Sequence, residues 1–278
     1  MKKIALIIAA VLTSTCTAFA KEPIKVLPEH VNKTTQWNGK RVGILGDSMS
    51  DPATPSSAWR FYSYLEQMLG IEPFSYAISG YQWKDLLGRA KAMKAEHPDD
   101  LDAILIWAGT NDYNHSLPIG DFFVNDQRMV NVNGTEQKRT HRTHVMADST
   151  YCGSINTVMS YLKEQFPEQQ IIILTPIHRG YANFGPTNIQ PDEEYANGAG
   201  YFIDDYASTL HKAGEVWSVP VIDLFSLSGI YPLYRAHDRY VGDITVDRLH
   251  PSDEGNYRIA LLLANQLPAL PANFKINR

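Results

Sequence analysis

Short apolar runs alternate with amphipathic stretches along most of the chain. The apolar runs are typical of buried strands and cover residues 41–46, 73–78, 103–108, 170–175 and 219–223. Between and after them, apolar residues recur at helical spacing, which predicts helices over 59–69, 83–96, 151–166, 194–218 and 252–266. Strands that alternate with helices predict an α/β fold with a parallel sheet covered on both faces, in one domain.

Three long segments do not fit this alternation: 113–149, 177–193 and 226–246. Loops of this length inside a compact domain are uncommon and often form the walls of binding sites. Each segment follows the end of a predicted strand, so we expect all three at one edge of the sheet. They can also be insertions that hold only local hairpins, and the sequence leaves this alternative open.

The amino-terminal end has the pattern of an export signal. Lysines are followed by an apolar run and by Ala18-Phe19-Ala20, which predicts a signal peptide over 1–20 and a periplasmic or secreted protein. The run is short for a bilayer span, so we expect no stable membrane insertion. Cleavage would remove Cys16 and leave Cys152 as the only cysteine. Lipid attachment at Cys16 is the weaker alternative, because Thr13-Ser14-Thr15 is a poor lipid-attachment motif.

The rest of the chain divides into a lead-in and one domain. Residues 21–40 are polar, contain proline and show no period, so we expect an extended lead-in before a single domain over 41–278. The formal net charge of −5, with 44% hydrophobic residues, is ordinary for a globular protein and offers no basic surface for nucleic acid. We therefore expect no nucleic-acid partner.

Polar residues suited to acyl transfer follow the predicted strands. Ser48 comes directly after the run 41–46, where a turn would lift it to the carboxyl edge of the sheet. Asp247 lies three residues before His250, a spacing that lets the carboxylate hold the imidazole while the other ring nitrogen faces a serine. The backbone N–H groups of Ser48 and Gly80 and the amide of Asn111 are candidate donors to a tetrahedral oxyanion. Alone, Ser48 and the pair of Asp247 and His250 are better explained by a turn and a helix cap, and Asn111 is also consistent with a plain turn.

Together, these residues resemble the motif blocks of the SGNH (GDSL-type) hydrolases. In order, the blocks are Gly46-Asp47-Ser48-Met49-Ser50, Gly80, Gly109-Thr110-Asn111-Asp112 and Asp247-Arg248-Leu249-His250-Pro251. The resemblance implies a flavodoxin-like three-layer α/β/α sandwich with a mainly parallel five-stranded sheet. It also implies serine esterase chemistry without a cofactor.

The resemblance assigns a role to each residue. It makes Ser48 the nucleophile, His250 the base and Asp247 the residue that orients the base. Ser48, Gly80 and Asn111 would form the oxyanion hole, and Asp47 would shape the turn. The sequence departs from the family at Ile78-Ser79, where an asparagine often precedes the glycine. An α/β-hydrolase is excluded, because the chain has no Gly-x-Ser-x-Gly pentapeptide.

Export and aromatic residues near the expected cleft favour deacetylation of a carbohydrate, with a small-molecule or polysaccharide ester as substrate. The candidate substrate-binding residues are Tyr81, Trp83, Tyr113 and Tyr181. The alternatives are a lysophospholipase, lipase or thioesterase of the same family, an acyltransferase, and a non-catalytic carbohydrate-binding protein. The sequence does not predict the oligomeric state.

Other reactive residue types give weaker signals. His115, His141 and His144 lack a carboxylate or cysteine at ligand spacing, so we expect no metal. Cys152 has no cysteine or histidine motif around it and is expected to be a small buried residue.

Overall fold

The computed structural model describes residues 22–270 and residue 274. The predicted signal peptide lies outside the described residues. The centre of the fold is a parallel five-stranded sheet in the order β2-β1-β3-β6-β9, formed by β1 Arg41–Gly46, β2 Glu72–Ser75, β3 Ala103–Trp107, β6 Gln170–Leu174 and β9 Val221–Ile222. This is the flavodoxin-like order, which reverses direction between β1 and β3.

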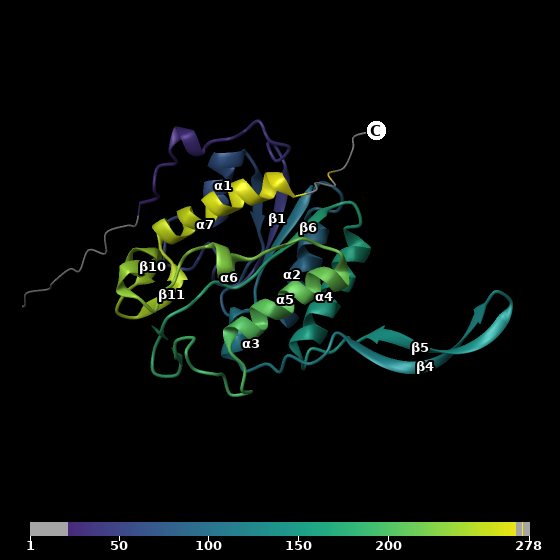
Figure 1. The fold of residues 1–278 in the computed structure, drawn as a ribbon. Helices are drawn as coiled ribbons and strands as arrows, with labels where there is room; N and C mark the ends of the chain where they lie inside the picture. The colour runs from purple at the N-terminus through teal and green to yellow at the C-terminus, as the bar shows by residue number, and fades with distance from the viewer. Residues whose placement is uncertain (1–21, 271–273, 275–278) are drawn as a thin grey trace, which may run out of the picture.

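Helices cover both faces of this sheet (Figure 1). One face carries α1 Phe61–Leu69 and α7 Asp253–Gln266, and the other carries α2 Trp83–Glu96, α4 Tyr151–Gln165 and α5 Ile203–Trp217. The predicted α/β/α sandwich is confirmed. Short helices complete the chain: α3 Thr110–Asn114, α6 Leu224–Leu227, η1 Pro28–His30, η2 Arg235–Tyr240 and η3 Leu267–Ala269. In the described part of the chain, no helix is both long enough and apolar enough to cross a membrane.

The two cores follow from the alternation of side chains along the strands. In β3, Leu105 and Trp107 pack on the side of α1 and α7, whereas Ile104 and Ile106 pack on the other side. In β1, a Cβ on Gly43 would lie 2.5 Å from the sulfur of Met93, so a larger residue there would force the Met93 side chain of α2 to shift. The central strands are buried on both faces, which explains their continuous apolar sequence.

The helix ends agree with the sequence signals except in α5. Gly70, in the left-handed conformation, ends α1, and the Ser252 hydroxyl accepts the N–H of Gly255 to cap α7. The helix predicted from residue 194 begins only at Ile203, so that prediction is wrong over its first nine residues. The cause is turn chemistry: the side-chain oxygen of Asn197 accepts the N–H groups of Ala199 and Tyr201.

A second, antiparallel sheet arises largely from two of the long segments. Its order is β10-β11-β7-β8, formed by β7 Ala182–Asn183, β8 Ile189–Gln190, β10 Val241–Asp243 and β11 Asp247–Pro251. A Cβ on Gly242 would lie 3.0 Å from a carboxylate oxygen of Asp247, which shows how closely β10 packs on β11. Segments 177–193 and 226–246 therefore lie at the edge that carries Ser48, as predicted.

The remaining long segment forms an arm. Strands β4 Phe123–Val132 and β5 Thr135–His144 pair along their whole length and project from the body on the side opposite β10 and β11 (Figure 1). Asn133 and Gly134 join them with positive φ angles of 52° and 83°, as the tightest hairpin turns require. The expectation that 113–149 lies beside Ser48 is therefore wrong for this hairpin.

Candidate active site

Ser48 lies two residues after the end of β1, at the point where the strand order reverses. A carboxylate oxygen of Asp47 accepts the N–H of Met49 at 3.0 Å, and the Asp47 carbonyl accepts the N–H of Ser50 at 3.0 Å. The Ser48 carbonyl accepts the hydroxyl of Thr54 at 2.9 Å. These bonds hold the turn on both sides of Ser48 and leave its hydroxyl directed to another partner.

That partner is His250 on β11. Its Nε2 lies 2.8 Å from the Ser48 Oγ, and its Nδ1 lies 2.9 Å from Oδ2 and 3.1 Å from Oδ1 of Asp247. Asp247 and His250 are both buried. A carboxylate that accepts the Nδ1–H leaves Nε2 free to accept the serine proton, so this arrangement can activate a hydroxyl.

The His250 segment is anchored through the fully buried Asn256 of α7. The Asn256 Oδ1 accepts the N–H of Phe61 at 3.0 Å, and its Nδ2 donates to the Pro251 carbonyl at 3.2 Å and to the Ser57 hydroxyl at 3.0 Å. One side chain therefore joins the start of α1, the loop before it and the end of β11. This network fixes His250 relative to the loop that follows Ser48.

Three candidate oxyanion donors line the same hollow: Ser48, Gly80 and Asn111. Among the described residues, the N–H groups of Ser48 and Gly80 have no protein acceptor. The amide Nδ2 of Asn111 lies 3.1 Å from the Tyr81 carbonyl and 3.3 Å from Oδ2 of Asp47. Both hydrogens of this amide thus have acceptors in the free protein. A substrate oxyanion would therefore share one of these hydrogens with its present acceptor.

Two buried acids lie behind Asn111. Burial raises the pKa of Asp47 to about 6. Burial, with the nearby charge of Asp47, raises the pKa of Asp112 to about 8. The Asp112 carboxyl group accepts the backbone N–H of Trp83 at 3.2 Å. A protonated Asp112 at neutral pH avoids two negative charges in the same dry region.

The hollow above Ser48 has a volume of about 270 Å³. Its lining includes the small residues Ala53, Thr54 and Pro55. The β7–β8 region contributes Phe184, Asn188 and Gln190 to the same lining. The Phe184 ring lies 5.2 Å from the His250 ring and is 43% exposed. The predicted contribution of 177–193 is therefore made by Phe184, Asn188 and Gln190, whereas the candidate substrate-binding residues are all tyrosine or tryptophan.

None of the four predicted substrate-binding residues lines the hollow above Ser48. Trp83 is fully buried at the start of α2, so its predicted substrate contact is wrong. Tyr113 is also buried, and its hydroxyl donates to the Tyr195 carbonyl at 2.6 Å beside a neighbouring hollow. Tyr81 and Tyr181 do not line the hollow above Ser48. Apolar burial therefore explains Trp83, and loop packing explains Tyr113.

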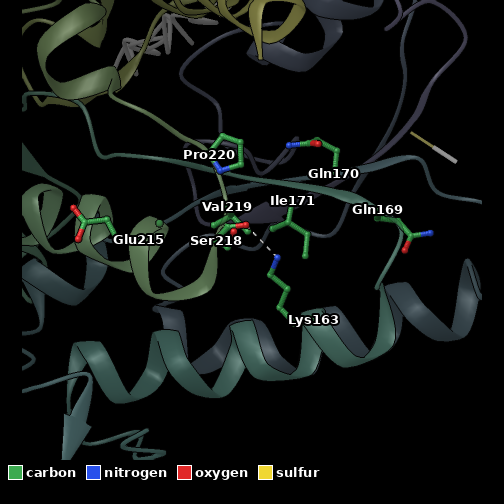
Figure 2. Close-up of a pocket in the computed structure, with 9 residues that line it drawn as sticks. Lys163, Gln169, Gln170, Ile171, Glu215, Ser218, Val219 and Pro220 are labelled. Atoms are coloured by element: carbon green, nitrogen blue, oxygen red, sulfur yellow. Dashed lines mark hydrogen bonds between the residues drawn. The ribbon is translucent and has the colours of Figure 1, made fainter. Parts of the chain in front are cut away.

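A larger hollow of about 480 Å³ lies at the other end of the sheet, where β6 begins and α5 ends (Figure 2). The Lys163 ammonium donates to the Ser218 carbonyl at 3.3 Å across it. Its lining contains no histidine to activate Ser218. This hollow therefore lacks the groups for acyl transfer, despite its greater volume.

The remaining histidine and cysteine candidates, His141, His144 and Cys152, make contacts that are typical of structural residues. His141 and His144 project from opposite faces of β5, where His141 pairs with Asp126 and His144 stacks on Trp217. Within residues 22–270, no group of three histidine, cysteine, aspartate or glutamate side chains is placed to hold a metal ion. Burial raises the pKa of the Cys152 thiol to about 12, so it remains protonated.

Solved structures share the fold at low sequence identity. A protein from Lactobacillus plantarum matches with 23% identity and a TM-score of 0.62, over 84% of this chain and 98% of its own. A possible lipase from Chitinophaga pinensis matches with 19% identity and a TM-score of 0.62, over 82% and 98%. The acetyl xylan esterase AlAXEase matches with 19% identity and a TM-score of 0.52, over 81% and 98%.

Among curated proteins, none matches the sequence. The sequence profile of the GDSL-like lipase/acylhydrolase family matches residues 44–258, a span that runs from β1 into α7 and holds Ser48, Gly80, Asn111, Asp247 and His250. Lipases and acylhydrolases act on ester bonds, which agrees with a serine and an imidazole in hydrogen-bond contact. Because the match covers most of the chain, the protein belongs to the GDSL-like lipase/acylhydrolase family.

Proposed function

We propose that the protein is an exported serine esterase that removes a small acyl group, acetyl above all, from a carbohydrate. The observation that carries the proposal is the 2.8 Å contact between the Ser48 Oγ and the His250 Nε2, with Asp247 behind the imidazole. Export rests on the signal pattern over 1–20.

In the first half of the reaction, the Ser48 oxygen attacks the ester carbonyl while His250 Nε2 takes its proton. The N–H groups of Ser48 and Gly80 and the amide of Asn111 stabilise the negative charge that forms on the carbonyl oxygen. The C–O bond of the ester then breaks, and the sugar hydroxyl leaves with the proton from His250. Asp247 stabilises the imidazolium between these steps.

In the second half, water replaces the alcohol. His250 takes a proton from the water as its oxygen attacks the acyl group on Ser48, and the same oxyanion donors act again. The bond to Ser48 breaks, and Ser48 recovers its proton from His250. The products are a carboxylic acid and the free enzyme, and these steps consume no cofactor.

The small volume of the hollow above Ser48 supports a small acyl group. The volume of about 270 Å³ lies below the range of about 300–1,000 Å³ usual for ligand pockets. The small residues Ala53, Thr54 and Pro55 are among those that line the hollow. A long acyl chain would extend into solvent and would lose the favourable free energy of burial on which a lipase depends to bind its substrate.

The part of the lining that comes from the β7–β8 region suits a sugar ring, which supports a sugar as the alcohol of the ester. Phe184 offers a flat apolar face, and Asn188 and Gln190 place amide groups beside it. AlAXEase shares the fold and is an acetyl xylan esterase, a likeness at 19% identity that concerns the fold alone. The fold is therefore compatible with sugar acetates.

The test is release of acetate by the mature protein from acetylated xylan, glucomannan and chitin oligosaccharides, beside 4-nitrophenyl acetate, butyrate, octanoate and palmitate. We expect acetate from at least one sugar ester and kcat/KM values that fall from acetate to palmitate. No reaction with any sugar ester, combined with a preference for palmitate, would replace the proposal with a lipase.

A further inference from the structure

A second hollow lies beside the one above Ser48. It has a volume of about 210 Å³ and is lined by Tyr113, Asn114, Ser116, Gln190, Tyr195 and Asn197. Gln190 lines both hollows. The two hollows therefore adjoin at Gln190.

A row of amides runs from one hollow to the other. The Asn114 Nδ2 donates to the Gln190 Oε1 at 2.8 Å, and the Gln190 Nε2 donates to the Asn188 Oδ1 at 2.8 Å. Each amide nitrogen carries two hydrogens, so Asn114 and Gln190 each keep one N–H that has no acceptor in the described part of the chain. The row presents fixed donors to a ligand that spans both hollows.

A buried cation holds this row in place. The guanidinium of Arg179 donates to Oδ1 of Asn114 and to the Pro191 carbonyl, and the Arg179 side chain is fully buried. Asn114 is the last residue of α3, whereas Pro191 follows β8. Arg179 therefore joins the two segments that carry the ends of the row.

Each hollow also has one exposed aromatic ring. Phe184, 43% exposed, lines the first, and Tyr195, 63% exposed, lines the second. Flat rings beside fixed amides suit the apolar faces and hydroxyl edges of sugars. A fatty acyl chain would bury the free amide hydrogens without a partner, so the second hollow disfavours a lipid.

We propose that the second hollow is a sugar subsite. It binds the unit next to the acylated one, so the substrate is a neutral oligosaccharide or polysaccharide of at least two linked sugars. This inference rests on the proposed carbohydrate esterase function, because the first hollow must hold the sugar that carries the ester. Tyr195 supplies the platform of the second subsite, and Asn114 and Gln190 supply donors.

The experiment compares kcat/KM for an acetylated monosaccharide glycoside and for the matching acetylated oligosaccharide. The proteins are the wild type, Tyr195→Ala and, as a matched control, Tyr234→Ala. Tyr234 is a 65% exposed tyrosine that lines neither hollow. We expect the ratio of oligosaccharide to monosaccharide kcat/KM to fall about tenfold in Tyr195→Ala, the equivalent of about 1.4 kcal/mol, and to stay at the wild-type value in Tyr234→Ala. An equal ratio in all three proteins would overturn the subsite.

A failure of the proposed function gives a different result. If nitrophenyl acetate reacts but no sugar ester does, calorimetry with unacetylated xylo-, manno-, cello- and chito-oligosaccharides tests the subsite directly. Binding that weakens in Tyr195→Ala would support the subsite although the ester assignment is wrong. Absence of binding by every oligosaccharide would overturn both proposals.

Discussion

The carboxyl group of Asp112 in α3 accepts the backbone N–H of Trp83 at 3.2 Å and thereby ties α3 to the start of α2. Asn111 immediately precedes Asp112, and Gly80 lies in the loop just before Trp83. The bond therefore sets the spacing between two of the three candidate oxyanion donors. Asp112 is a positioning residue in this account, because it does not line the hollow.

Asp112→Asn should make the protein more stable at high pH. The pKa of Asp112 rises from an ordinary value of 3.8 to about 8 in the folded protein. Between about pH 4 and pH 8, the folded state therefore holds a proton that the unfolded state releases, so stability falls as the pH rises. Asparagine keeps an oxygen for the Trp83 N–H and has no charge.

Thermal melts of the wild type and Asp112→Asn between pH 4 and pH 9 measure this effect. The gain in Tm of the variant should be smallest at pH 4 and reach at least about 2–4 °C by pH 8, which corresponds to about 1 kcal/mol. A gain that does not change with pH would show that Asp112 ionises as an ordinary carboxylate.

Asn111→Ala should lower kcat more than it raises KM. The amide would contact the oxyanion, which carries its full charge only in the transition state, and loss of one such donor costs about 10²–10³ in kcat. The measurement is steady-state hydrolysis of 4-nitrophenyl acetate by both proteins, with circular dichroism to confirm folding. A change confined to KM would assign Asn111 to ground-state binding.

Asn256→Ala should destabilise the protein by about 1–3 kcal/mol, because it leaves the N–H of Phe61 and other buried groups without a partner. Asn265→Ala on the same helix is the control, since Asn265 is exposed and, within the described part of the chain, its side chain bonds only to the Leu261 carbonyl. Urea unfolding measures both variants. Equal midpoints would show that Asn256 does not anchor the loop before α1.

Removal of the arm should leave the esterase intact. Replacing 125–142 with Asn-Gly keeps the base of the hairpin, where Phe123 packs against α5 through His144 and Trp217. No arm residue lines the hollow above Ser48. We expect kcat/KM for 4-nitrophenyl acetate within about twofold of the wild type. A tenfold loss would show that the arm reaches the site.

The parallel sheet could be predicted from the sequence because strands such as β3 and β6 are buried on both faces and hence continuously apolar. Helix boundaries were predictable where caps are local, as at Gly70 and Ser252. The start of α5 could not be predicted in this way. The side chain of Asn197 forms a turn that replaces the first part of the expected helix, and the apolar pattern does not reveal this turn.

The structure brings Ser48, Asp247 and His250 into contact, and each of these residues belongs to a local motif that the sequence displays. The candidate substrate contacts in the β7–β8 region do not belong to a local motif. Phe184 and Gln190 reach the hollow only through the pairing of β7 with β8 and with β11, a long-range arrangement without local signal. Trp83 follows Tyr81 and Gln82 in the sequence, yet its side chain is buried in the core.

The most direct test is hydrolysis of 4-nitrophenyl acetate by the mature wild type and by Ser48→Ala, with mass spectrometry after exposure to a serine-directed phosphonate. The account predicts a rate loss of at least about 10³-fold in the variant and a phosphonyl adduct on Ser48 of the wild type alone. Equal rates in the two proteins, or an adduct on another residue, would contradict the assignment of Ser48 as the nucleophile.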